Sequence, residues 1–291
     1  MIKTGKDISS WQAIRTFMKV GSCSEAMCNV LNRAYDQPLE TEENAAMPLA
    51  GGIMQQGYQC GLIWGAALAA GAQAYRQYGP GPEAETMTIR AAQKVMGSFL
   101  THSKDTNCFE ITEVDWRVPK EMRKFMLKGG PIRCFRRAGR AAPLAHRELK
   151  ETFDGDPVDA PEGPVSCAAE LIRKLGGSEL HQTMASGFAG GIGLSGGGCG
   201  ALGAAIWLHS MKNKNANDGK LDYNDPKLKQ LVEEFAKQSG FEYECEKIVG
   251  RRFTDTSDHA EYLRQGGCAE LMKKLAEDVA AGPAKPESPN T

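Results

Sequence analysis

Nine cysteines are the residues of this chain whose type and spacing could carry chemistry. Eight of them form two sets of four in the same order along the chain. The gaps between successive cysteines are 37, 48 and 26 residues in the first set and 32, 46 and 23 in the second. Four thiolates can hold an iron–sulfur cluster, so the spacing predicts one cluster, [4Fe–4S] or [2Fe–2S], per set. The predicted ligands are Cys23, Cys60, Cys108 and Cys134 in the first set, and Cys167, Cys199, Cys245 and Cys268 in the second.

The ninth cysteine, Cys28, has no counterpart in the second set. Ile172 holds the matching place, which favours an apolar and buried environment. A buried free cysteine behaves as a small apolar residue. We therefore expect Cys28 to contribute to packing and not to ligation.

The segments around the second cysteine of each set indicate that the chain is a duplication. Gly51-Gly52-Ile53 and Cys60-Gly61 recur 139 residues later as Gly190-Gly191-Ile192 and Cys199-Gly200. The turn-rich stretch 154–164 then separates a first four-cysteine module, residues 1–153, from a second, residues 165–281. The proline-containing tail, residues 282–291, is expected to be disordered.

Helical periodicity dominates the chain, and no segment alternates with period two. We therefore predict an all-α fold of two duplicated helical modules related by pseudo-twofold symmetry. Amphipathic helices are expected at Ser10–Lys19, Ser24–Tyr35, Thr86–Leu100, Cys167–Leu175, Pro226–Ser239 and Cys268–Ala281.

Most of the eight cysteines are expected at the start of a helix. Ser22 and Ser166 directly precede a cysteine and are good N-cap residues, and glycines precede Cys199 and Cys268. The positive end of a helix favours thiolate and lowers the pKa of a thiol. Glycine lets the backbone approach a bulky group closely, so we also expect glycines beside the cysteines to contact the cofactor. These are Gly52, Gly61, Gly191, Gly198 and Gly200.

The order cysteine, Gly-Cys-Ala-x-x-Gly, cysteine, cysteine resembles the redox-active C_GCAxxG_C_C proteins, twice over. The second module carries Gly198-Cys199-Gly200-Ala201-Leu202-Gly203, with glycine where the family has alanine. The first module departs further, because Gln59 replaces the first glycine and Gly65 lies one residue late. The resemblance implies a redox role and iron–sulfur ligation but no particular reaction.

The sequence also allows other kinds of site besides an iron–sulfur cluster. Thiol–disulfide exchange by the same cysteines without metal is the main alternative, and zinc is a weaker one because closely spaced ligand pairs are missing. Gly191 to Gly196 matches G-x-G-x-x-G, but no strand precedes it, so nucleotide binding is disfavoured. The five histidines show no ligand spacing, and only His209 is a candidate for tuning a nearby site.

The composition excludes further classes of function. Lys and Arg total 35 against 36 for Asp and Glu, which argues against nucleic-acid binding. The basic stretch from Arg133 to Arg140 is interpreted as a solvated helix face. No signal peptide or membrane span is visible, so a cytoplasmic chain is expected. No catalytic residue can be assigned, because acid–base pairs and nucleophile triads are missing. Electron transfer to a partner enzyme is favoured, while direct substrate turnover stays open.

Overall fold

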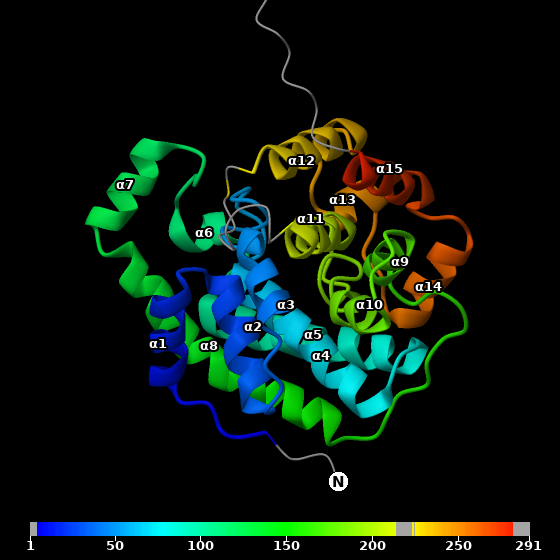
Figure 1. Cartoon of the computed structure of the whole chain (residues 1–291), viewed down its shortest axis with the longest axis horizontal. Helices are drawn as coiled ribbons and strands as arrows, with labels where there is room; N and C mark the ends of the chain where they lie inside the picture. Colours follow the sequence, from blue (N-terminus) through cyan, green and yellow to red (C-terminus); the bar gives the residue numbers. More distant parts are fainter. Residues whose placement is uncertain (1–4, 214–222, 224, 282–291) are drawn as a thin grey trace, which may run out of the picture.

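The computed structural model describes residues 5–213, 223 and 225–281, so the predicted disordered tail lies outside the described residues. Within these ranges the chain forms fifteen α-helices and one 3-10 helix (Figure 1). Extended backbone pairs only in two isolated bridges, Gln59 with Asn107 and Gly198 with Glu244. The all-α prediction is confirmed.

The helices follow one another in the same order in the two modules. α9 to α15 repeat the order of α2 to α8, and α1 is an addition to the first module. The first module contains α1 (Ser10–Val20), α2 (Cys23–Ala34), α3 (Glu40–Ala45), η1 (Met47–Leu49), α4 (Gly61–Tyr78), α5 (Pro82–Ser103), α6 (Cys108–Thr112), α7 (Pro119–Leu127) and α8 (Gly130–Phe153). The second contains α9 (Cys167–Lys174), α10 (Glu179–Ser186), α11 (Gly200–Asn213), α12 (Pro226–Gln238), α13 (Cys245–Val249), α14 (Thr256–Arg264) and α15 (Ala269–Ala280).

The modules contact each other through equivalent elements. α4 packs on α10 of the second module, and its counterpart α11 packs on α3 of the first. Glu42 and His181, which are 139 residues apart, lie 3.2 Å apart between Oε1 and Nε2. Such reciprocal contacts are those of an isologous, twofold interface. Superposition of the two modules stays a prediction.

Two fully buried tryptophans, one from each module, pack in this interface. Trp64 of α4 lies edge-on to Phe188, with ring centroids 4.7 Å apart. A Cβ on Gly203, the counterpart of Trp64, would lie 2.3 Å from the Trp64 ring, so only glycine leaves room there. Trp207 of α11 donates its indole N–H to the carbonyl of Glu42 at 2.9 Å. A single apolar core therefore runs through both modules.

The connection between the modules is non-helical from residue 154 to 166, which agrees with the turn-rich stretch predicted there, and it is exposed at Asp156. None of the described helices combines the length and apolar character needed to cross a membrane.

Candidate functional site

The four cysteines of the first module line one cavity of about 210 Å³. Cys23 is the first residue of α2, Cys60 directly precedes α4, and Cys108 is the first residue of α6. Cys134 lies one turn inside α8. Three helix N-termini and one helix side therefore bring together side chains that are up to 111 positions apart in the sequence.

A short backbone pairing brings the second and third cysteines of each set side by side. The Cys60 N–H donates to the Thr106 carbonyl at 2.7 Å, and the Cys108 N–H donates to the Tyr58 carbonyl at 2.6 Å. The second module repeats both bonds: the Cys199 N–H donates to Tyr243 at 2.7 Å and the Cys245 N–H to Gly197 at 2.6 Å.

The backbone ahead of each second cysteine turns in the left-handed sense. Five successive residues have positive φ in each module, residues 51–55 and residues 190–194. Left-handed turns are costly for residues with a Cβ, so Ile53 and Ile192 hold strained conformations that the surrounding fold must enforce. Gly52 and Gly191 allow the chain to fold back on itself, since a Cβ there would lie 2.3 and 2.5 Å from backbone atoms.

The second module places its four cysteines around a much smaller cavity of about 20 Å³. Cys167 and Cys245 begin α9 and α13, Cys199 directly precedes α11, and Cys268 precedes α15 with a φ of 58°. The donor set matches that of the first module, but the space has room for about one water molecule.

Aromatic residues line part of each cavity: Trp116 lines the first, and Phe253 and Tyr262 line the second. In the first module Trp116 packs on Phe125 and donates its indole N–H to Cys108 Sγ at 3.3 Å. Phe253 and Tyr262 occupy the corresponding places in the second, and the Tyr262 hydroxyl lies 3.7 Å from Cys268 Sγ. Sequence reasoning missed these residues, although both pairs share the 137-residue shift that relates Cys108 to Cys245.

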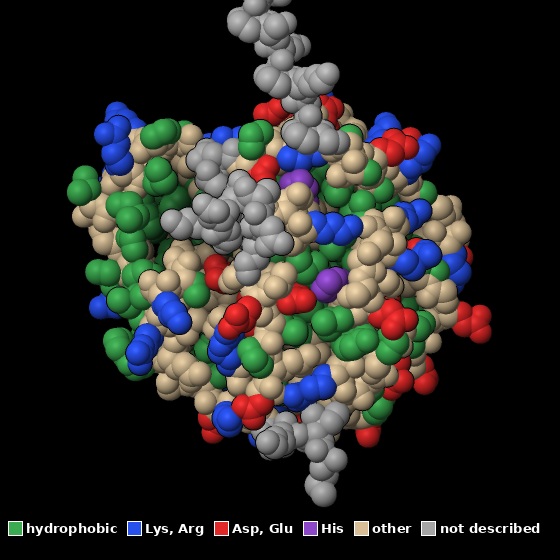
Figure 2. Space-filling view, in the orientation of Figure 1, with side chains coloured by type: hydrophobic (Ala, Val, Ile, Leu, Met, Phe, Trp, Pro, Cys, Tyr) green, Lys and Arg blue, Asp and Glu red, His purple; other side chains and the backbone are tan. Residues whose placement is uncertain are grey.

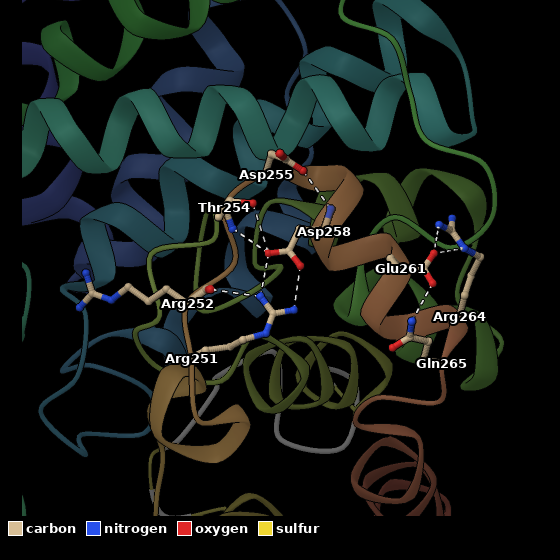
Figure 3. Close-up of polar contacts among 8 residues, drawn as sticks. All are labelled: Arg251, Arg252, Thr254, Asp255, Asp258, Glu261, Arg264 and Gln265. Atoms are coloured by element: carbon tan, nitrogen blue, oxygen red, sulfur yellow. Dashed lines mark hydrogen bonds and ion pairs between the residues drawn. The ribbon is translucent and has the colours of Figure 1, made fainter.

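A polar frame fixes the loop that carries Phe253 (Figure 3). The Arg251 guanidinium donates two hydrogen bonds of 2.7 and 2.8 Å to the Asp258 carboxylate, which also accepts from the Thr254 N–H at 2.9 Å. Asp255 accepts a bond from the Asp258 N–H at 2.9 Å and thereby caps α14. These hydrogen bonds fix the loop that carries Phe253 and the start of α14, the helix that carries Tyr262.

The expectation that helix N-termini lower the thiol pKa values is wrong for these sites. Burial raises the pKa of Cys108 to about 12, that of Cys134 to about 11 and that of Cys199 to about 12. The neighbouring Cys23 thiol, together with burial, raises the pKa of Cys60 well above its ordinary value. Desolvation exceeds the helix-end effect, so these thiols stay protonated at neutral pH unless a metal replaces the proton.

The glycines predicted to contact a cofactor mostly lie behind the cavity walls. Gly200 lines the second cavity, whereas Gly52, Gly61, Gly191 and Gly198 are not among the lining residues of either cavity. A Cβ on Gly61 would lie 2.5 Å from Cys23 Sγ, so this glycine makes room for a cysteine. Gly198 accommodates Gln59, whose Oε1 accepts its N–H at 2.6 Å across the interface.

The cysteines surround cavities and do not converge on one point. Within the described ranges, no three His, Cys, Asp or Glu side chains are placed to hold a single metal ion. Zinc needs four ligands at about 2.0–2.3 Å from one centre, which brings the sulfurs almost into contact. The spacing therefore does not favour the zinc alternative.

Neither His209, the histidine singled out in the sequence, nor His259 lines the first cavity. His209 lies 3.7 Å from Asp225 and lines neither cysteine cavity. His259 does line the second cavity, but its Nδ1 is bonded to the Val165 carbonyl at 2.8 Å. Residues 191–196 belong to the left-handed turn and its continuation, so the G-x-G-x-x-G match has no strand–helix context.

Cys28 is fully buried on α2 and lines neither cysteine cavity. Its sulfur lies 3.6 Å from Asn32 Nδ2 in the core. Cys28→Ala should therefore leave the iron content of the reconstituted chain unchanged, measured as iron per chain after desalting. A loss as large as that of Cys23→Ala would make Cys28 a ligand.

Comparison with known sequences matches two regions of the chain, residues 22–147 and 166–281, to one family. The family is described as "Putative redox-active protein (C_GCAxxG_C_C)". Neither curated proteins nor solved structures give a match. The two matches divide the chain into the same two modules that carry the cysteine sets, so the tandem duplication predicted from the sequence is confirmed.

Proposed function

Since this chain belongs to the C_GCAxxG_C_C family of redox-active proteins, we propose that it is an iron–sulfur protein that transfers electrons to a partner enzyme. The observation that carries the proposal is the single cavity of about 210 Å³ lined by Cys23, Cys60, Cys108 and Cys134. Four thiols around a space larger than one ion suit a group that contains several irons.

The two modules differ in how well they fit such a group. The first offers the complete donor set and a cavity roughly ten times larger than that of the second. The second offers the same donors around a space of only about 20 Å³, whose lining includes Phe253 and Tyr262. We therefore propose that the first module holds the resident cluster. The cluster predicted for the second module does not fit this conformation.

The chain's own groups supply the environment of the first site. An iron–sulfur cluster supplies one-electron transfer when bound. The Trp116 indole donates to Cys108 Sγ, and hydrogen bonds to ligand sulfurs stabilise added negative charge. Phe17, Leu62 and Ile111 give the cavity an apolar lining.

Thiol–disulfide exchange is the competing proposal, and the burial of the thiols disfavours it. An exchanging thiol must be reachable and must ionise. Cys60 and Cys108 are only 7% and 6% exposed, and the pKa values of both lie above the ordinary value.

The surface beside the first cavity suits an acidic redox partner. Met122, which lines the cavity, is 37% exposed, and Met126 and Leu127 beside it are 58% and 89% exposed. Figure 2 shows hydrophobic side chains gathered at the left edge, over α7 and α1. Exposed cations surround the apolar residues of α7, namely Lys120, Arg123, Lys124 and Lys128. An apolar centre with a basic rim favours a partner whose own rim is acidic.

The deciding experiment is anaerobic reconstitution of the full chain with ferrous iron and sulfide. After desalting, we expect iron and acid-labile sulfide in equal amounts and a visible absorption that dithionite bleaches. The same preparation exposed to air should lose the absorption, because the predicted centre is oxygen-sensitive.

Negligible iron after reconstitution would contradict the proposal. If the iron-free chain instead formed disulfides reversibly among the eight cysteines, thiol–disulfide exchange would replace it. Mass spectrometry after thiol alkylation distinguishes these outcomes.

A further inference from the structure

A further cavity of about 270 Å³, distinct from the two cysteine cavities, adjoins the first four-cysteine site and has no role in the proposed electron transfer. It lies between α5 and α8. Buried apolar side chains, including Met27 and Leu62, form its floor. Arginines that are exposed or half-buried form its mouth. An apolar floor with polar groups at the mouth is the usual build of a small-molecule site.

The mouth carries a concentration of positive charge. Arg133, Arg136, Arg137 and Arg140 all line the cavity, and their spacing along α8 places them on one helix face. The lining contains no aspartate or glutamate. Arg133 lies over the Phe125 ring at 5.6 Å, and the other three form no ion pair within the described part of the chain. Like charges at this spacing repel one another, so the helix alone does not explain the arrangement.

An unpartnered hydroxyl lines the same cavity from α5. Ser98 Oγ is buried and has no hydrogen-bond partner. One turn further on, His102 Nδ1 is bonded to the Ser98 carbonyl at 2.8 Å, which orients the imidazole at the cavity. A buried hydroxyl left without a partner is destabilising, because the hydrogen bonds it made with water are not replaced. An acceptor oxygen of a ligand would satisfy it.

We propose that this cavity binds a small organic oxyanion, held by its phosphate or carboxylate group at the arginines, with its apolar part on the floor. A guanidinium group can donate two parallel hydrogen bonds to a phosphate or carboxylate group, and the Ser98 hydroxyl adds a neutral donor. Arg137 and Leu62 line both this cavity and the cysteine cavity, so the ligand would lie directly beside the redox site.

The inference goes beyond the proposed function and does not need a cluster to be present. The test therefore uses the full chain without iron. Calorimetric titration at fixed ionic strength would compare phenyl phosphate with inorganic phosphate. We expect both to bind, and phenyl phosphate to bind more tightly because its ring covers the apolar floor. R136Q/R140Q should weaken the binding of both by roughly tenfold or more.

The matched control is Arg147→Gln, on the same helix. Arg147 is bonded to Glu148 and does not line the cavity, so this variant should bind like the unmodified chain. Circular dichroism would verify that all variants are folded. The proposal is overturned if neither probe binds, or if R136Q/R140Q binds as tightly as Arg147→Gln. Binding of inorganic phosphate alone would overturn the assignment of an organic ligand.

Discussion

Replacing Cys108 by alanine should remove most of the iron that the reconstituted chain retains, whereas Cys245→Ala should leave most of it. The two cysteines hold equivalent places, since each begins a short helix and donates its backbone N–H to the carbonyl two residues before the second cysteine of its set, Tyr58 or Gly197. They differ in the volume of the cavity that each lines, which is about 210 Å³ for Cys108 and about 20 Å³ for Cys245. Loss of a ligand matters only where the space admits the cluster.

The measurement is iron and acid-labile sulfide per chain, made on both variants prepared side by side. Cys28→Ala accompanies them as a cysteine that is buried but lines neither cavity. Equal losses from Cys108→Ala and Cys245→Ala would contradict the prediction. That result would mean that Phe253 and Tyr262 move aside and that both modules load, as the sequence alone suggests.

The cysteine sets were predictable because a duplication preserves order and spacing. Each set does gather around one cavity, and Ser22 and Ser166 do cap the helices that begin with Cys23 and Cys167. The difference in size between the cavities was not predictable. It depends on how the residues around each set of sulfurs pack, and this tertiary packing cannot be inferred from local sequence pattern.

The role of α8 was also not predictable from the sequence. The helix continues through Pro143, a residue that usually ends or kinks a helix, and its full span Gly130–Phe153 was not among the predicted helices. The Arg133 to Arg140 stretch was interpreted as a solvated helix face. Only the packing of α8 against α5 reveals that these arginines line a cavity. The left-handed turns were likewise hidden, because Ile53 and Ile192 are poor candidates for positive φ.

The structure also gives a physical reason why the first module has Gln59 where the family pattern has glycine. Gln59 stands where the second module has Gly198, and its side chain lies against that same glycine. Its Nε2 donates to the Gly191 carbonyl at 3.2 Å, and its Oε1 accepts from the Gly198 N–H at 2.6 Å. A Cβ on Gly198 would lie 2.8 Å from Gln59 Oε1, so the glycine of the second module leaves room for the glutamine of the first.

The same interface yields the largest expected effect on stability, from Trp64→Ala. Trp64 is fully buried between the modules, packs on Phe188 and donates its indole N–H to the Gln59 carbonyl at 3.1 Å. Removing a buried tryptophan leaves a cavity and lowers the free energy of unfolding by about 3–5 kcal/mol. Trp64→Phe should cost less, because most of the ring contacts remain. Guanidinium denaturation followed by circular dichroism measures both variants.

Trp11→Ala provides the matched control, because Trp11 is 66% exposed on α1 and its removal should change the free energy of unfolding by less than about 0.5 kcal/mol. Since one apolar core runs through both modules, the unmodified chain should unfold in a single transition. A Trp64→Ala variant as stable as Trp11→Ala would mean that the modules do not pack through α4 and α11. Two separate transitions in the unmodified chain would mean that each module folds independently, and the reciprocal contacts would then contribute little to holding the modules together.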